Sequence, residues 1–565
     1  MKPGVAAAAL QDTFALKLAR RIGAALFRTR LYAWTLPRKA PLELPVLPDH
    51  AWPGSAANAD RLFQGRFIFA GVEVVSPHAP PWSMTAEELR LDAPSFEGWA
   101  AVLHGFGWLR DFAAQGGDMA RRMSRSLVTS WLERHQRIQG LPWRADVAGR
   151  RLAHWLSHAH FLLQGADEAF AHDFLLGIER HAVHLGRIAR FAPPGQPRID
   201  AFLGLAYVAE CLPRGDLKPG QRPYPLAVQQ LSEAAEQQVL ADGGHASRCP
   251  SRVFLMLRDL VPLWQFLRVV DPERAALLQP YLDRMAPMLR FFRHGDGGLA
   301  LFHGGEEEIP AQIDQVLDLS ESKGKPLSSA HLSGFERAVV KRALLLLDAG
   351  APPPAFAGSR PHHGLLAFEF SHGKDRLIVN CGAARRAGGG WAAALSGIAA
   401  HSTVTLGNAE PVDGARVKVA RNEQDGAVWF ELEHDGWAPV FGGRLHRRRL
   451  YLSAGGDDLR GEDTITATGA ADRGQPVEAV LRLHLHPSVH ASALASGDTV
   501  ILKSGSGQGW RFRGAGGVVR LEDSVYFGRN DANGGGEPRR TQQIVMTGSA
   551  GAEPLVFKWA LSRIG

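Results

Sequence analysis

The chain has 565 residues, of which 45% are hydrophobic and 21% charged, and its mean hydropathy is −0.13. These values are typical of globular domains and exclude a long disordered protein, and no run of ~20 apolar residues is present to span a membrane. The net charge is +7, from 64 basic and 57 acidic residues. Arginine dominates the basic residues, which permits an anionic ligand without requiring one.

Residues 1–84 are predicted to form an extension that begins with a short amphipathic surface helix and continues into a Pro-rich segment. The sequence RFIFAGVEVV at 66–75 favours a short pair of strands. Charged residues interrupt the apolar N-terminus, so no signal peptide is predicted. We therefore expect a cytoplasmic protein, with the periplasm as the alternative.

Residues 85–349 are predicted to form a helical domain. Apolar residues recur with helical spacing from Met119 to Trp131 and again from Leu152 to Leu163. Gly and Pro break the pattern into segments. Further helices are expected near 167–191, 199–213, 224–241, 250–269, 272–292 and 334–349.

Residues 350–565 are predicted to form a β-sandwich. Glycine rises from about 8% of residues 1–350 to about 15% of residues 351–565, against ~7% on average, and the Pro-rich segment 349–358 is interpreted as a linker. Many short strands with Gly-rich turns are typical of a sandwich or related double sheet. Strands are expected at 365–370, 376–380, 402–407, 427–433, 444–453, 479–486, 499–503 and 554–562.

Two loops between helices carry residues suited to chemistry. The segment ADGGHASRCPSR (241–252) holds His245, Arg248 and Arg252, and it is either a site loop with backbone amides available to an anion or a structural connection. The segment DGGLALFHGGEEE (296–308) places His303 at the end of an apolar run that is followed by three acids.

In the β region, His401 stands at the entry to a predicted strand. Alternation along 479–486 puts His484 and His486 on one face, where two histidines can share a metal, although no complete ligand set is recognisable. The same alternation along 444–453 places Arg449 and Tyr451 together, either on a solvated basic face or in a binding surface.

Several classes of protein are excluded or disfavoured. The three cysteines match neither a disulfide framework nor a CxxC metal site, and reduced structural thiols are expected. No GxxxxGK[ST], HExxH or GxSxG motif is present. The sequence pI is about 9.4, but no basic stripe with interleaved aromatic residues supports a nucleic-acid partner.

Seven segments, spread over most of the chain, resemble the heparinase II/III-like family. They are LHGFGWLRDF (103–112), WRADVAGRRLAHWLSHAHFLL (143–163), DGGHASRCPS (242–251), LALFHGG (299–305), AAHSTVTLGN (399–408), LHRRRLYLSAGGDDLRGED (445–463) and LRLHLHPSV (481–489). The resemblance implies an incomplete (α/α) toroid followed by an antiparallel β-sandwich. It also implies a lyase that cleaves uronate-containing acidic polysaccharides or oligosaccharides by β-elimination.

In such a lyase the uronate carboxylate is neutralised, a base removes the C5 proton, and an acid protonates the leaving oxygen. The resemblance implies His401 and His245 as the proton-transfer pair and Arg248 on the carboxylate. No cofactor is predicted, with a structural divalent metal near His484 as the alternative, and no oligomeric state is predicted. The residues expected to bind substrate are His303, Arg252, Tyr451, Arg449 and Tyr224.

The chain departs from the characterised lyases at two positions. They place an Asn beside the toroid histidine, where this chain has Gly244 and Ala246, and they use a toroid tyrosine that has no recognisable counterpart here. A non-catalytic carbohydrate-binding or envelope-polysaccharide assembly protein is therefore the alternative function. A hydrolase that uses Glu306–Glu308 and Asp314 is a third.

Overall fold

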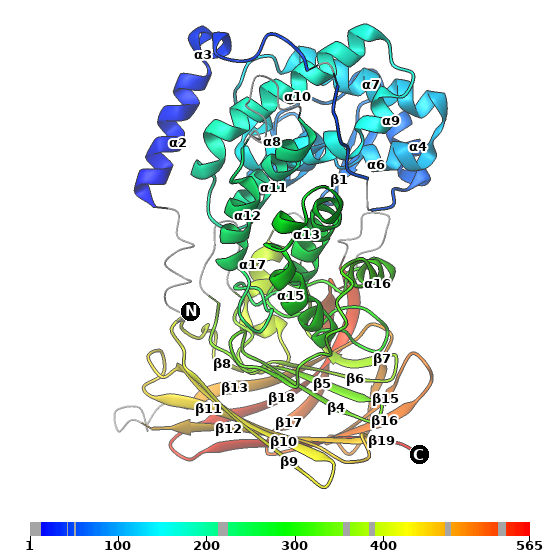
Figure 1. The fold of residues 1–565 in the computed structure, drawn as a ribbon. Helices are drawn as coiled ribbons and strands as arrows, with labels where there is room; N and C mark the ends of the chain where they lie inside the picture. Colours follow the sequence, from blue (N-terminus) through cyan, green and yellow to red (C-terminus); the bar gives the residue numbers. More distant parts are fainter. Residues whose placement is uncertain are drawn as a thin grey trace. The chain divides into compact units, whose positions relative to one another are not determined.

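The structure, a computed structural model, describes residues 13–41, 43–49, 52–212, 224–353, 362–383, 390–468, 476–528 and 538–565. The chain forms two compact units (Figure 1). The first comprises Met1–Gln238 and Arg258–Leu282, and the second comprises Val239–Leu257 and Asp283–Gly565. The chain passes between the units three times, once after Gln238 and twice within helices, α13 (Pro250–Val270) and α15 (Gln279–Phe291).

The first unit is helical apart from one hairpin in its described residues, and that hairpin confirms the strand pair predicted at 66–75. The extension 1–84 belongs to this unit. Its elements, besides α13 and α15, are α2 (Phe14–Phe27), α3 (Arg30–Trp34), α4 (Ala56–Phe63), β1 (Arg66–Phe69), β2 (Val72–Val75), α5 (Ala93–Gly105), α6 (Leu109–Gln115), α7 (Gly117–Arg134), η1 (Leu141–Trp143), α8 (Ala145–Ser157), α9 (Ala159–Leu163), α10 (Glu168–Ile188), η2 (Ala189–Phe191), α11 (Gln196–Cys211), α12 (Ala227–Glu236) and α14 (Pro272–Ala275).

Helix α11 is the centre of the first unit, because it is buried on all sides from Ile199 to Ala209. It crosses α8 at a pair of glycines. A Cβ atom on Gly204 would lie 2.5 Å from Cα of Gly149, so only glycine permits this close approach. The helices predicted from the sequence pattern are confirmed except 334–349, although Met119 of the predicted stripe is 69% exposed.

Two antiparallel sheets form most of the second unit. One has the strand order β14-β15-β16-β19-β12-β11-β10-β9, and the other has the order β17-β18-β13-β7-β6-β5-β4-β3, with β8 paired to β13. The helical elements of this unit include α16 (Pro310–Leu319), α17 (Trp391–Ser396) and η3 (Ile398–Ala400). The strands are β3 (Ser329–Ala330), β4 (Phe335–Val340), β5 (Ala343–Asp348), β6 (Phe368–His372), β7 (Asp375–Val379), β8 (Val404–Leu406), β9 (Val417–Gln424), β10 (Ala427–Trp437), β11 (Arg444–Leu452), β12 (Asp458–Ala467), β13 (Val477–Leu485), β14 (His490–Ala493), β15 (Thr499–Lys503), β16 (Gly509–Ala515), β17 (Val518–Tyr526), β18 (Arg539–Ala550) and β19 (Leu555–Arg563).

The inner faces of the two sheets share one apolar core, which confirms the predicted sandwich. Leu345 and Leu483 come from one sheet, and Phe430 and Trp510 come from the other. Alternate residues of each strand point into this core. All eight strands predicted from period-two alternation overlap strands of the structure, and the three cysteines are buried thiols outside any disulfide.

One predicted helix is wrong. Residues 334–349 form the antiparallel hairpin of β4 and β5, so the strands begin before the expected boundary at 350. The cause lies in β5, whose six residues ALLLLD are all buried inside the sheet. A continuous apolar run in a buried strand has no alternation that separates it from a buried helix. Residues 354–358 of the expected linker lie outside the described part of the chain.

The described helices include none that combines the length and the apolar character needed to cross a bilayer.

Candidate functional site

A buried cluster of charged and imidazole side chains lies in the second unit. Its members come from the turn before α13, from the loop 299–305, from the end of β5 and from the turn that leads into β8. Asp348, at the end of β5, is the residue that joins them. Asp348 is not among the site residues predicted from the sequence, because it stands in the segment 334–349, which was expected to be helical.

Arg248 is fixed by five hydrogen bonds. Its Nε donates to the carbonyl of Ser333 at 2.7 Å, and its Nη atoms donate to one oxygen of Asp348 and to three carbonyls, those of Gly334, Gly350 and Ala351. The guanidinium also stacks 4.7 Å from the Phe335 ring. A guanidinium has five donors, so all of them are used within the fold. This geometry departs from the predicted role of Arg248 on a substrate carboxylate.

His303 lies against the other oxygen of the same carboxylate. Its Nε2 is 2.8 Å from Oδ2 of Asp348, and both side chains are buried. Burial lowers the pKa of His303, even though Asp348 acts in the opposite direction. Burial alone would raise the pKa of Asp348, but Arg248 and His303 outweigh it and lower that pKa. The pair is therefore a neutral imidazole in contact with a carboxylate whose charge Arg248 compensates.

Arg248 and His303 both have left-handed backbone conformations, with φ of 59° and 48°. A non-glycine residue in this region costs free energy, and such residues concentrate where the surrounding structure imposes a special geometry. The contacts around Arg248 and His303 therefore hold both residues in conformations that they would not adopt on their own.

His401 is close to this pair. Its Nδ1 lies 2.9 Å from the carbonyl of Gly397, which makes Nδ1–H the donor and leaves Nε2 as the basic nitrogen. Burial and the neighbouring His303 lower the pKa of His401 to about 4. Gly364 permits the ring position, because a Cβ atom there would lie 2.7 Å from Cδ2 of His401. The ring of His362 lies 5.8 Å away, edge-on.

His245 has different described neighbours. Its Nδ1 accepts hydrogen bonds from the amide and the hydroxyl of Ser247, at 3.0 and 2.7 Å. Burial and the nearby Arg252 lower the pKa of His245 to about 3. The loop is tied to the turn between β3 and β4 by Asp242, which accepts hydrogen bonds from the amide and hydroxyl of Ser333. His245 and Arg248 thus share a loop, and Arg248 is the one linked to Asp348 and His303.

Arg449 and Tyr451 are brought together, but on another surface. They project from the face of β11 opposite to Arg448, and Arg448 donates a hydrogen bond to the carbonyl of Ser402, next to His401. Tyr451 packs 5.0 Å from Trp429, in an open depression of about 650 Å³. Their predicted common face is confirmed, whereas this face is not the one that meets the cluster of His303 and His401.

The remaining predicted residues are placed as follows. Tyr224 belongs to the first unit, where burial raises its pKa to about 12. Asp314 pairs with Arg293 at 2.8 Å. Glu307 accepts a hydrogen bond from the Tyr526 hydroxyl, so this acid is used within the fold.

The residues around His484 do not fit a metal ion. Its Nδ1 bonds to the Ser524 hydroxyl at 2.8 Å, and its Nε2 donates to the carbonyl of Ala399 at 3.0 Å. Both ring nitrogens are therefore occupied. The described residues contain no group of three or more His, Cys, Asp or Glu side chains arranged to hold a metal.

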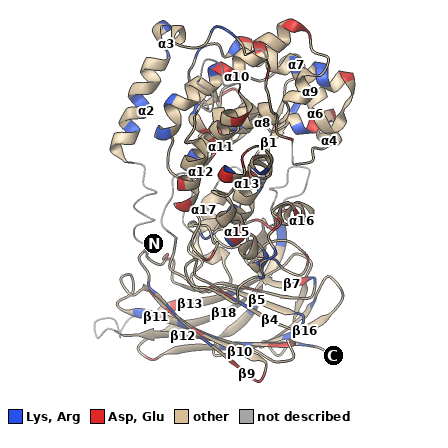
Figure 2. Ribbon diagram, in the orientation of Figure 1, with Lys and Arg blue, Asp and Glu red and all other residues tan. Residues whose placement is uncertain are grey.

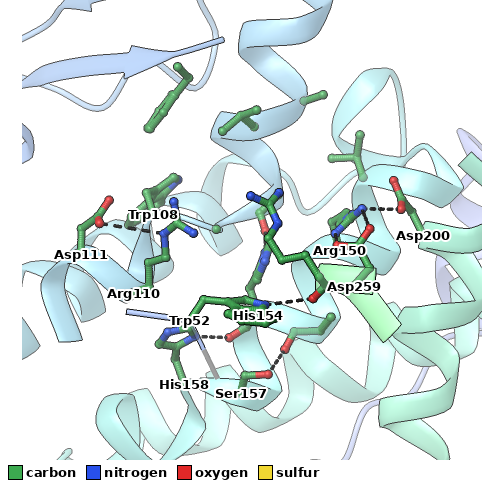
Figure 3. Close-up of a pocket in the computed structure, with 18 of the residues that line it drawn as sticks. Trp52, Trp108, Arg110, Asp111, Arg150, His154, Ser157, His158, Asp200 and Asp259 are labelled. Carbon is green, nitrogen blue, oxygen red and sulfur yellow. Dashed lines mark hydrogen bonds and ion pairs between the residues drawn. The ribbon is translucent and has the colours of Figure 1, made fainter. Parts of the chain in front are cut away.

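A second candidate site is a pocket within the first unit (Figure 3), and it was not predicted from the sequence. Its volume of about 460 Å³ is in the range of small-molecule sites. Arg150 reaches Asp259 at 2.5 and 2.6 Å and Asp200 at 2.7 Å, and burial raises the pKa of Asp200 to about 6. Other lining residues include Trp52, Trp108, Arg61, Arg110 and Arg258. These residues come from separate segments, so no local motif marks the pocket.

Comparison with known proteins identifies the family. A family model described as "Heparinase II/III-like, C-terminal" matches residues 322–560. FtsZ-localized protein C of Caulobacter vibrioides (strain NA1000 / CB15N) is 31% identical over 550 residues, which cover 94% of this chain and 91% of that protein. The chain belongs to the heparinase II/III-like family.

Solved structures agree on the fold. The crystal structure of heparinase III superposes with a TM-score of 0.68 at 12% identity, covering 97% of this chain and 91% of that one. Heparan sulfate lyase HepC from Pedobacter heparinus gives a TM-score of 0.60 at 15% identity, covering 96% and 88%. The fold is an incomplete toroid of helices followed by an antiparallel β-sandwich, as the sequence resemblance implied.

Proposed function

We propose that this protein acts at the FtsZ division site and that it does so without cleaving a glycan. The observation that carries the proposal is the match to FtsZ-localized protein C, which extends over nearly the whole of both chains. A relation of this length includes both structural units. The lyase scaffold is then a shared architecture, and fold alone does not fix an activity.

The buried cluster supports a non-lytic role. Elimination beside a uronate needs a cation or donor on the carboxylate, and Arg248 directs its donors to Asp348 and to main-chain carbonyls. The two tyrosines of the second unit are also placed elsewhere. Tyr526 is bonded to Glu307, and Tyr451 lies on the outer face of its sheet.

The test is sedimentation of the full-length protein with FtsZ polymers assembled with GTP. We expect the protein to pellet with the polymers and to stay in the supernatant when GTP is omitted. Equal recovery in the supernatant under both conditions contradicts the proposal. Bovine serum albumin, at the same concentration, controls for trapping in the pellet.

A uronate lyase is the second candidate function, and His401 is the observation that favours it. Its tautomer is fixed by Gly397, and its Nε2 is a basic nitrogen of the kind that removes a proton. The assay follows ultraviolet absorbance of the unsaturated product on a panel of uronate glycans, with heparinase III as the positive control. Product that disappears in His401→Ala supports this candidate, and its absence with folded protein rejects it.

A further inference from the structure

Helix α2 (Phe14–Phe27) turns a row of large apolar side chains toward the surface. Phe14, Leu18, Ile22 and Leu26 follow one another every four residues, and they are 80%, 45%, 62% and 58% exposed. Residues four apart share one face of a helix. Single exposed apolar residues need no explanation, but a contiguous row of four is the pattern of an interaction site.

The opposite face of α2 is the one that packs on the first unit. Ala19, Gly23 and Phe27 are partly buried, and the ring of Phe27 lies 5.2 Å from that of His184. Arg20 donates a hydrogen bond to the carbonyl of Phe191 at 3.0 Å. The helix is therefore docked by one side, and its apolar row is the outward side.

Basic residues line the edge of that row. Lys17, Arg21 and Arg28 are exposed, and at 100° per residue they lie together beside Phe14 on the helix surface. The coloured ribbon shows Lys and Arg on α2 and no acidic residue (Figure 2). The short helix α3 (Arg30–Trp34) follows and exposes Leu31 and Trp34, at 69% and 66%.

The net positive charge of the chain is concentrated in its first 40 residues. Residues 1–40 hold eight of the 64 Lys and Arg and one of the 57 Asp and Glu. The other 525 residues therefore carry 56 of each and are neutral as a group. The net charge of +7 is thus a local property of the segment that contains α2 and α3, and a local positive charge attracts an anionic surface.

We propose that α2 and α3 form an interfacial element that lies on an anionic lipid bilayer. The apolar row enters the boundary between headgroups and acyl chains, and Lys17, Arg21 and Arg28 contact lipid phosphates. A short helix with aromatic and aliphatic residues on one side and basic residues beside them is the pattern of such elements. The absence of any acidic residue in 13–40 favours an anionic surface over a protein surface of mixed charge.

The experiment is flotation of the full-length protein with lipid vesicles. We expect binding to vesicles of phosphatidylcholine with 30% phosphatidylglycerol, much weaker binding to phosphatidylcholine alone, and loss of binding at high salt. The double variant Leu18→Glu/Ile22→Glu is expected to abolish binding. The double variant Lys17→Glu/Arg21→Glu is expected to reduce the partition coefficient on anionic vesicles by about tenfold or more.

Matched controls distinguish lipid binding through α2 from nonspecific binding through other exposed apolar side chains. Met119→Glu and Val269→Glu remove apolar side chains of the same unit that are 69% and 84% exposed, and both variants are expected to bind as the wild type does. Thermal unfolding confirms that each variant is folded. Equal binding by Leu18→Glu/Ile22→Glu and the wild type overturns the proposal. The proposal is also overturned if the wild-type protein binds neither kind of vesicle. It is overturned as well if the apolar row instead forms a dimer interface, so that the wild type is a dimer and Leu18→Glu/Ile22→Glu is a monomer.

Discussion

Nε2 of His303 lies 2.8 Å from Oδ2 of Asp348, while the other oxygen of the same carboxylate accepts a hydrogen bond from Arg248. One buried carboxylate therefore joins the loop that carries His303 to the turn that precedes α13. Removing one partner from such a group leaves an uncompensated charge in a medium of low dielectric constant.

Asp348→Asn is expected to destabilise the protein by about 3–5 kcal/mol, because it leaves the buried guanidinium of Arg248 without its counter-charge. Urea unfolding monitored by circular dichroism measures the change. The control is Glu433→Gln, which removes the partner of Lys418, a side chain that is 82% exposed. That variant should change stability by less than about 1 kcal/mol. Equal effects of the two substitutions would show that Asp348 is not a structural centre.

Stability is expected to fall as the pH drops from about 6.5 toward 4. His401 has a pKa near 4 in the folded protein and an ordinary value of about 6.5 when unfolded. The unfolded chain therefore binds more protons in this window, and stability is complete above it and lost on acidification. His401 contributes about 3 kcal/mol to this loss by pH 4.

The measurement is the urea midpoint of wild type and His401→Gln at several pH values. Loss of the imidazole changes the stability at every pH by a constant amount. It should also make the pH dependence flatter, and this change of slope is the result that reports on the pKa of His401. Parallel pH profiles for the two proteins would mean that the folded and unfolded states hold His401 with the same pKa.

Substitutions of two neighbouring arginines of β11 are expected to lower the stability of the protein by very different amounts. Arg448 is fully buried and donates to Asp463 at 2.6 Å, whereas Arg449 is 48% exposed and pairs with Glu431 on the surface. Arg448→Ala should cost about 3–5 kcal/mol and Arg449→Ala less than about 1 kcal/mol. Chemical denaturation of the two variants compares them directly, and a reversed order would refute the assigned faces of the strand.

Gly364→Ala is expected to disturb His401, because the added Cβ would lie 2.7 Å from the ring. Overpacking of this kind costs about 1–3 kcal/mol. Gly414 is the matched control, since a Cβ there meets nothing within 4 Å, and its substitution by alanine should be near neutral. A Gly364→Ala protein as stable as Gly414→Ala would indicate that the His401 ring moves aside freely.

The sequence predicted the architecture better than the site. Helical spacing and period-two alternation are local signals, and they located most helices and eight strands. They failed at 334–349, where β5 is buried throughout and lacks alternation. That failure hid Asp348, and with it the reason why Arg248 and His303 belong together. Residues that meet only through long-range pairing, such as Arg248 and Asp348, leave no signal in local spacing.

The net charge of the chain likewise could not be interpreted without the structure. A net charge of +7 says little about function until its position is known, and here that position is the first 40 residues. Helical periodicity predicted an amphipathic helix there, but only the structure shows that its apolar row faces outward while Phe27 packs inward.

The measurement that tests the proposed function most directly is the location of a fluorescent fusion of the full-length protein in its own dividing cells. The proposed role predicts a band at the division site that forms with FtsZ and disperses when FtsZ is depleted. A uniform distribution, or a band that persists without FtsZ, would contradict it.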